Sequence, residues 1–438
     1  MFRKWIRKFF LILSLFLGIL LFQNCSKSGF NATETVLLSN DGQGNPTPTP
    51  YATSDDLSFI LQPSSQKVIV GQVVTFRARG ASLSNLPLTY QWYKNNFAIA
   101  GATSTSYQTP ILTKAEDDFR YHVLISNANR TLNSNQATLT VQTEDEIVPV
   151  ADLIIAPSTV DPAMSDEFGD FIVQFNENVS RKSKLFIFFP ASGSNPAMDL
   201  LIIKNAALNG FHAIGFPYAN RDVVALLCAS DPDVSCQAKI REETLTGADA
   251  SPKVIVSVAD SVNNRMLSIL KYLAQSFPAQ GWSNFFLGDQ VIWDDLRLSG
   301  HSQGGGLAAF AAIKNSVDRV CTFSSPADFD NDLNIPANWV VDNGLTSPSR
   351  YYGLGSTKDN IVPWVNLQKI WNKLGMGAFG VPVNIDGVGV GYNGSHMLNT
   401  SQGTAGNGHG IPVVDSVTPK NTNGKPLFVG TWQYLCFH

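Results

Sequence analysis

The chain has 438 residues, which suggests two or three domains at roughly 150 residues per domain. Hydrophobic residues make up 44% and charged residues 15%, which excludes global disorder, because disorder requires few apolar residues and much charge. The formal net charge of −4 offers no basic surplus to neutralise phosphates, so nucleic acid is not expected as a partner. A mean hydropathy of +0.00 excludes a polytopic membrane protein. Five cysteines are too few for a disulfide-built scaffold.

The N-terminus has the pattern of an export signal. Basic residues precede an apolar run from Phe9 to Phe22, which is shorter than the roughly 20 residues of a membrane-spanning helix. Cys25 follows this run and resembles the lipobox cysteine of bacterial lipoproteins, although the two residues before it are not small. The resemblance implies a signal peptide over residues 1–24 and a lipid anchor on Cys25. The protein would then be held at the bacterial outer membrane or cell surface; an uncleaved anchor and a secreted form are the alternatives.

Residues 25–56 are rich in Ser, Asn, Thr, Gly and Pro, and such a composition predicts a flexible tether. Residues 57–143 contain short β-branched and aromatic runs separated by turn residues, which predicts an all-β sandwich. This segment resembles bacterial Ig-like domains, since Trp92 matches their core tryptophan and Tyr121 their corner tyrosine.

Ala78 and Val123 stand where antibody-type Ig domains have cysteines, so we expect apolar packing without an inter-sheet disulfide. We see no ligand-binding cluster in this segment. It is expected to serve as a spacer or to contact a surface or polymer.

Residues 144–438 alternate apolar strand-like runs with helical patterns, which predicts an α/β fold with a mostly parallel sheet and flanking helices. The clearest expected elements are strands at 171–175, 184–189, 210–216 and 296–299, and a helix at 258–277.

The run Gly300-His301-Ser302-Gln303-Gly304 lies between a predicted strand and an Ala-rich helix. Strand, G-x-S-x-G and helix together resemble the nucleophile turn of the α/β-hydrolase family of esterases and lipases. Side chains at the flanking positions would collide with the neighbouring strand and helix, which explains the glycines. The resemblance implies that Ser302 is a nucleophile. The alternative is a glycine-rich turn with an idle serine.

The same resemblance implies an acid and then a histidine downstream of the serine. Asp359 is the expected acid, because it follows a predicted strand in the pattern G-x-x-x-D-x-I-V-P; Asp328 and Asp330 are the alternatives. His396 is the expected base, because it lies in the loop after 382–387, which we expect to be the last parallel strand. His409 is its rival.

The resemblance also implies an oxyanion hole of two backbone amides. One amide would belong to Gln303 and the other to Ala191 or Ser192, because Pro190 has no N–H. No metal site and no cofactor are expected.

Cys228 and Cys236 bracket a short polar loop and are expected to form a disulfide in an exported protein. Cys321 and Cys436 are expected either to pair or to stay buried and free. The Cys228–Thr246 insert and the Gly387–Gly394 loop are expected to shape the pocket.

These features predict a surface-tethered serine hydrolase that cleaves a carboxylic ester through an acyl-enzyme. One alternative is an acyltransferase with the same triad. The other is a non-catalytic adhesin that uses the hydrolase fold and the Ig-like region as binding surfaces.

Overall fold

The computed structural model describes residues 57–83, 85–143 and 152–438. The predicted signal peptide, the lipidation site Cys25 and the tether lie outside the described residues. Within the described ranges, no helix is both long enough and apolar enough to cross a membrane.

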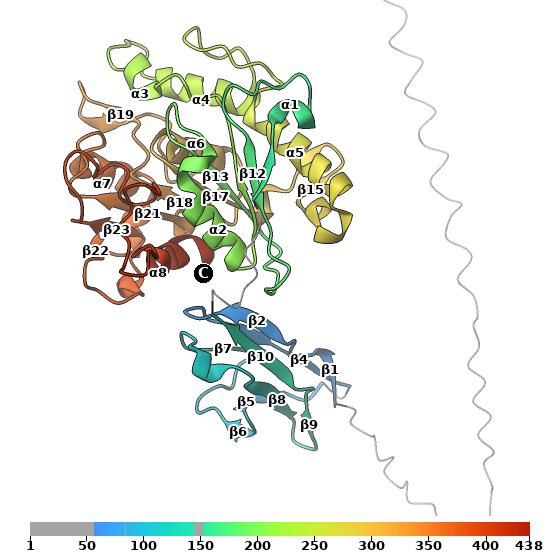
Figure 1. The fold of residues 1–438 in the computed structure, drawn as a ribbon. Coiled ribbons are helices and arrows are strands. Elements are labelled where there is room, and N and C mark those ends of the chain that lie inside the picture. Colours follow the sequence, from blue (N-terminus) through green and yellow to red (C-terminus); the bar gives the residue numbers. More distant parts are fainter. Residues whose placement is uncertain (1–56, 84, 144–151) are drawn as a thin grey trace, which may run out of the picture. The chain divides into compact units, whose positions relative to one another are not determined.

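Short strands make up the N-terminal β region (Figure 1). They are β1 Leu57–Leu61, β2 Gln66–Ile69, β3 Thr75–Arg77, β4 Arg79–Ser82, β5 Thr89–Lys94, β6 Phe97–Ala98, β7 Ser106–Gln108, β8 Arg120–Ser126, β9 Thr131–Asn133 and β10 Ala137–Gln142. The largest sheet runs in the order β2-β10-β8-β5-β6, with β9 on β8, while β1 pairs with β4 and β3 pairs with β7.

The core of this β region forms around Trp92 and Tyr121, which are 0% and 1% exposed. The Trp92 ring nitrogen donates to the carbonyl of Ser104 at 2.9 Å, so its one polar group is satisfied within the core. Ala78 and Val123 are buried in the same cluster. Apolar packing therefore fills the positions where antibody-type domains place cysteines.

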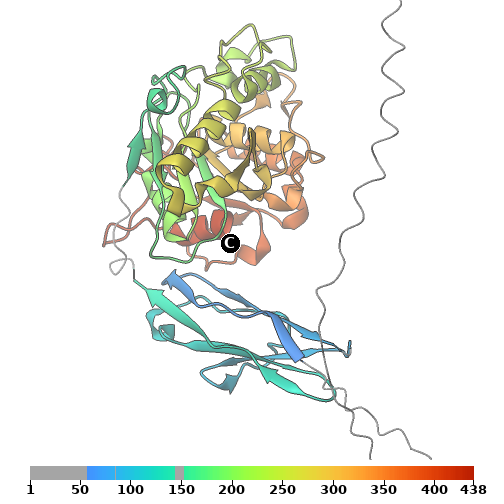
Figure 2. The same ribbon diagram turned by 90° about the vertical axis from the view of Figure 1, so that its right-hand side faces the viewer.

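A mostly parallel sheet begins after the β region, which confirms the predicted fold class (Figures 1 and 2). Its strands are β11 Leu153–Ile155, β12 Phe171–Gln174, β13 Leu185–Phe189, β14 His212–Gly215, β17 Leu296–His301, β18 Arg319–Phe323, β21 Tyr351–Ser356, β22 Val383–Asn384 and β23 Met397–Thr400. The order is β11-β12-β14-β13-β17-β18-β21-β23-β22. The two antiparallel pairings in this sheet are β11 with β12 and β12 with β14. The strands from β14 to β22 run parallel, so their carboxyl ends meet at one edge.

Helices cover both faces of this sheet, because its strands carry apolar side chains on both sides. Residues of α5 (Val262–Ser276), α6 (Gln303–Lys314) and α7 (Trp364–Lys373) join one cluster with Leu185 and Ile187 of β13. Residues of α2 (Leu200–Leu208) and α8 (Val429–Trp432) join the other cluster with Phe186 and Phe188 of the same strand.

Smaller elements connect the sheet strands. They are α1 Pro157–Val160, α3 Val224–Leu227, α4 Cys236–Thr246, β15 Phe286–Leu287, β16 Gln290–Val291, β19 Phe329–Asp330 and β20 Ile335–Pro336.

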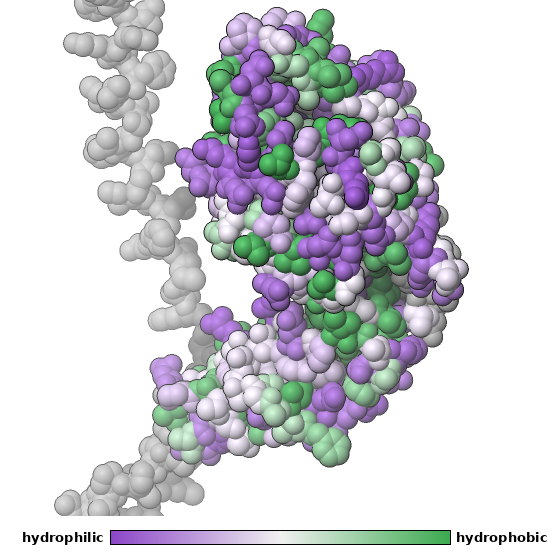
Figure 3. All heavy atoms as spheres, turned by 90° about the vertical axis from the view of Figure 1, so that its left-hand side faces the viewer, coloured by the Kyte–Doolittle hydropathy of each residue, from purple (hydrophilic) through white to green (hydrophobic). Residues whose placement is uncertain are grey.

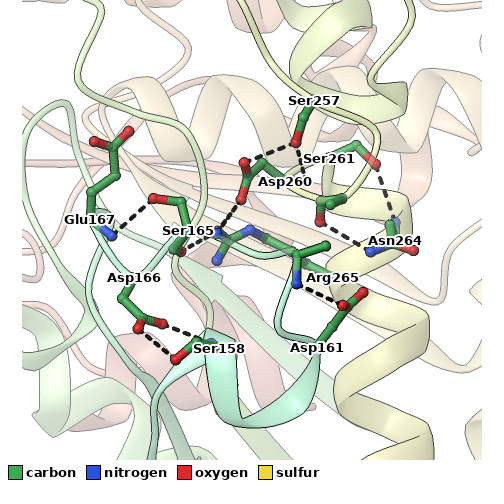
Figure 4. Close-up of polar contacts among 12 residues, drawn as sticks. Ser158, Asp161, Ser165, Asp166, Glu167, Ser257, Asp260, Ser261, Asn264 and Arg265 are labelled. Atoms are coloured by element: carbon green, nitrogen blue, oxygen red, sulfur yellow. Dashed lines mark hydrogen bonds and ion pairs between the residues drawn. The ribbon is translucent and has the colours of Figure 1, made fainter.

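A polar network attaches the segment between α1 and β12 to helix α5 (Figure 4). Arg265 of α5 is 0% exposed, and its Nη2 donates to the Asp260 carboxylate and to the Ser165 carbonyl, each at 2.6 Å. Asp260 also accepts the Ser165 amide at 2.8 Å. In the same segment, Asp166 accepts the amide and hydroxyl of Ser158 at 2.7 and 2.6 Å. Side-chain hydrogen bonds thus order a stretch of chain that has little regular structure.

Two disulfides are present in the described part of the chain. Cys228–Cys236 confirms the predicted local bond, and Cys321 of β18 pairs with Cys436 near the C-terminus. Arg297 of β17 donates to the carbonyl of Cys436 at 2.7 Å, so the last residues are attached to the central strands at more than one point. Disulfides persist in oxidising compartments, which indicates an extracellular or exported protein.

The face that carries α7 and β19 is turned towards the viewer in Figure 3. Hydrophobic side chains lie there in separate groups, with hydrophilic side chains between them.

Candidate active site

Ser302 occupies a sharp turn between β17 and α6. Its φ of 52° and ψ of −121° lie in a region that non-glycine residues rarely adopt, so the turn holds the serine in a strained conformation. A Cβ on Gly304 would overlap the carbonyl oxygens of Phe189 and Pro190, and one on Gly300 would lie 2.5 Å from the carbonyl carbon of Gly304. Both glycines are therefore required by close backbone approach, as the sequence predicted.

The N-terminus of α6 begins directly after the serine. Gln303 is the first residue of this helix, so its N–H is one of the four that have no intrahelical acceptor. The helix dipole adds partial positive charge at this end. An oxyanion that forms on a group attacked by Ser302 would be stabilised there.

Asp359 pairs with His409 and not with His396, which corrects the expected pairing. The Asp359 Oδ2 lies 2.8 Å from His409 Nδ1, and its Oδ1 accepts the amides of Ile361 and Val362 at 2.9 Å. Burial by itself opposes ionisation, but the hydrogen bonds from His409 and the two amides outweigh it and lower the pKa of Asp359.

His396 lies away from Asp359 because it directly precedes β23. The sequence pattern predicts it in a loop after the last parallel strand. β23 runs parallel to β21, so residue 396 at its start lies at the edge opposite to the one where β17 ends at Ser302. The His396 Nδ1 bonds to the Tyr351 carbonyl at 2.9 Å, and the ring stacks on Tyr352 and Phe379. Burial lowers the pKa of His396 to about 4, so the ring is a neutral packing element.

His301, the neighbour of Ser302, contacts the histidine that pairs with Asp359. Its Nε2 lies 2.9 Å from the His409 carbonyl oxygen, and the two rings are 4.8 Å apart. His301 is 4% exposed, and burial, together with His409, lowers its pKa to about 3. A neutral His301 therefore connects the serine turn to the His409 loop.

The alternative acids Asp328 and Asp330 have other partners. The Asp328 carboxylate forms a bidentate ion pair with Arg241 and accepts the Trp339 ring N–H at 2.7 Å. Both members of the ion pair are buried, with 1% and 2% exposure. Asp330 accepts the amide of Leu333 at 2.9 Å. Within the described residues, neither of these carboxylates is bonded to a histidine.

A pocket of about 240 Å³ opens beside Ser302. Its apolar wall includes Val224, Phe329, Ile361 and Ile370, and its polar groups include Ser192, Arg241, Asp328, Asn331 and Asn366. The insert after Cys228 contributes Arg241 through α4, as predicted. The 387–394 loop instead lines a second pocket of about 260 Å³, together with Leu427 and Phe428.

The loop after β13 approaches the start of α6. Ser192 lines the pocket, and its hydroxyl donates to the Gln303 side chain at 2.9 Å. The carbonyl of Ala191 accepts the Asn220 amide at 2.7 Å, and the carbonyl of Pro190 accepts the Tyr218 hydroxyl at 3.1 Å. Of the two candidate amide donors, Ser192 lines the pocket and Ala191 does not.

Among the described residues, no group of three or more His, Cys, Asp and Glu side chains is arranged to hold a metal ion.

The histidine that pairs with Asp359 is preceded by Gly408, and this glycine is a sequence signal for the pairing. A Cβ on Gly408 would lie 2.5 Å from the Lys358 carbonyl group, so only glycine lets the loop approach Asp359 this closely. His409 also follows β23, which lies next to β21 in the sheet, and Asp359 lies in the loop after β21. A glycine directly before a histidine, after the last strand, therefore indicates the loop that approaches Asp359.

Comparison with known proteins gives no family assignment, because no family model and no curated protein matches the chain. Solved Ig structures are similar to the N-terminal β region. A structure of tandem Ig repeats of Dlar is 17% identical with a TM-score of 0.18, and the match covers 20% of this chain and 50% of that one. The Ig1-2 module of the Drosophila receptor protein tyrosine phosphatase DLAR is 16% identical with a TM-score of 0.20, covering 31% and 61%. A chimeric titin Z1Z2 is 23% identical with a TM-score of 0.18, covering 20% and 95%.

Proposed function

We propose that the protein is a serine hydrolase with an α/β-hydrolase fold, and that it cleaves carboxylic esters through an acyl-enzyme. The observation that carries the proposal is the strained Ser302 at the head of α6, whose neighbour His301 contacts a histidine paired with a buried carboxylate. A pocket beside the serine provides room for the acyl or alcohol part of a substrate.

In this mechanism, the Ser302 hydroxyl attacks the ester carbonyl and gives its proton to His409. Because His409 Nδ1 is bonded to Asp359, Nε2 is the nitrogen that would accept the proton and return it to the leaving alcohol. Asp359 fixes the tautomer and stabilises the imidazolium. The amides of Gln303 and Ser192 would bind the oxyanion, and water would release the acyl group.

Labelling with a fluorophosphonate tests the nucleophile directly. The wild-type protein and the matched control Ser349→Ala, at an exposed serine in a short 3-10 helix (Pro348–Arg350), are expected to take up one label. Ser302→Ala is expected to take up none. A series of p-nitrophenyl esters then defines the preferred acyl length. Equal labelling of Ser302→Ala and wild type would disprove the proposal.

The same assay, repeated with alcohols or amines present, separates a hydrolase from an acyltransferase. Transfer of the acyl group to the added alcohol or amine in preference to water would identify the protein as an acyltransferase. Absence of both label and turnover in the wild type would support the adhesin alternative.

We also propose that the mature protein is lipid-anchored through Cys25 at the outer membrane or cell surface, with the N-terminal β region as a spacer or contact surface. The basic residues, apolar run and cysteine support this. Cys25→Ser is expected to accumulate as an unprocessed precursor that takes up no labelled palmitate. A wild-type protein without label would exclude the anchor.

A further inference from the structure

We infer that the side chain of Gln303 is a positioning residue that holds the two substrate-side loops against the serine turn. This inference rests on the proposed function, and it extends the role of Gln303 from its backbone amide to its side chain. The side-chain amide joins the loop after β13 to the loop after β14, and both loops line the pocket.

The Gln303 side chain makes three hydrogen bonds in a nearly closed environment, since the residue is 7% exposed. Its Oε1 accepts the Ser192 hydroxyl at 2.9 Å and the Val224 amide at 3.0 Å. Its Nε2 donates to the Asp222 carbonyl at 2.9 Å. The planar side-chain amide thus accepts two hydrogen bonds and donates one, and its three partners lie on two separate loops.

A hydrogen bond from Arg241 to its carbonyl oxygen holds the main chain of Gln303 in place. Arg241 donates through Nη1 to the Gln303 carbonyl oxygen at 3.2 Å, while its other nitrogens pair with Asp328. Because this ion pair is buried, the guanidinium is rigidly oriented. The main chain of Gln303 is therefore fixed, and its side chain can hold the two loops in a defined position relative to Ser302.

Other contacts in the loop after β13 do not replace the Gln303 bridge. Asn220 donates to the carbonyls of Ala191 and Ser194 at 2.7 and 2.8 Å, which braces the loop on either side of Ser192. The hydroxyl of Ser192 reaches across to α6 through Gln303. Removing the Gln303 side-chain amide would leave the loop after β13 attached to the loop after β14, but would remove the hydrogen bond that attaches Ser192 to α6.

Loss of this attachment should slow the chemical step more than it weakens substrate binding. A donor displaced by about 1 Å can cost on the order of 100-fold in rate, because the oxyanion is bound only in the transition state. Gln303→Ala is expected to lower kcat about 10- to 100-fold, with KM changed by no more than about twofold. The second-order rate of fluorophosphonate labelling should fall by a similar factor.

The test compares five variants with the wild type: Gln303→Ala, Gln303→Glu, Ser192→Ala, the Gln303→Ala/Ser192→Ala double variant and Gln368→Ala, a partly exposed control on α7. The double variant is expected to be no slower than Gln303→Ala, because both changes break the same connection. Gln303→Glu, which keeps the shape but loses the donor to Asp222, is expected to have an intermediate kcat and guards against misfolding of the alanine variant. Thermal melting verifies that each variant is folded.

A kcat within about twofold of wild type for a folded Gln303→Ala would overturn the inference, as would full additivity in the double variant. These outcomes are distinct from failure of the proposed function, in which the wild type itself shows no Ser302-dependent turnover or label.

Discussion

The Asp359 carboxylate lies 2.8 Å from the His409 ring, although the two residues are 50 positions apart in the sequence. The side chain of Asp359 is 1% exposed and that of His409 is 14% exposed, so the carboxylate is shielded from water while part of the imidazole remains accessible. Such an arrangement keeps the carboxylate ionised and the ring oriented while one ring nitrogen remains available for proton transfer.

The first prediction separates the two histidines. His409→Ala is expected to lower kcat by several orders of magnitude, because the general base would be missing. His396→Gln, which can still donate to the Tyr351 carbonyl, is expected to keep most of its turnover. Ester hydrolysis by purified variants of equal folded content checks this. Turnover lost only in His396→Gln would contradict the proposed triad.

The second prediction concerns the serine turn. Gly304→Ala is expected to be strongly destabilised or inactive, since the added Cβ would overlap the carbonyl oxygens of Phe189, at the end of β13, and of Pro190, which follows it. Gly389→Ala is the matched control, because a Cβ there would have no atom within 4 Å. Denaturant unfolding and ester turnover measure both effects. Equal stability and activity in the two variants would refute the close approach of α6 to the loop after β13.

The third prediction is a dependence of stability on pH. Burial lowers the pKa of His396 to about 4, so between about pH 6.5 and pH 4 the unfolded chain binds a proton there that the folded protein does not. The free energy of unfolding should therefore fall as the pH falls through this window. His396→Gln should show a shallower dependence in denaturant titrations at several pH values. An identical slope in the variant would show that His396 is not buried in its neutral form.

The fourth prediction compares the two disulfides. Cys321 and Cys436 are 115 residues apart, and closing a loop of that length stabilises by about 5 kcal/mol in the chain-entropy account. Cys228 and Cys236 are 8 residues apart, for which the same account gives about 2–3 kcal/mol. Paired alanine replacements, compared by denaturant unfolding, should differ in this order. A larger loss for the Cys228–Cys236 pair would contradict it.

The sequence was sufficient for features whose cause is local. Apolar runs, the helix at Val262–Ser276 and the glycines around Ser302 all follow from short-range patterning or from close backbone approach. The Asp359 position follows from the strand before it.

The histidine partner of Asp359 was predicted wrongly because strand order is not a local property. The run 382–387 resembles a strand, yet it contributes only Val383–Asn384, which pairs at the end of the sheet beside β23. β23 is the short, partly polar Met397–Thr400, whose burial comes from its neighbours in the sheet. His396 precedes that strand and His409 follows it, so a correct assignment needed the pairing of β21 with β23.

The Cys321–Cys436 bond joins a central strand to a residue near the end of the chain, whereas Cys228 and Cys236 are close neighbours. In a chain exported from its N-terminus, Cys228 and Cys236 both reach the oxidising compartment long before Cys436 does. Cys321 must therefore wait as a free thiol, open to mispairing with the earlier cysteines. Correct maturation of this protein would then depend on thiol–disulfide exchange in the compartment that receives it, and heterologous production in a reducing cytosol should yield a less stable product.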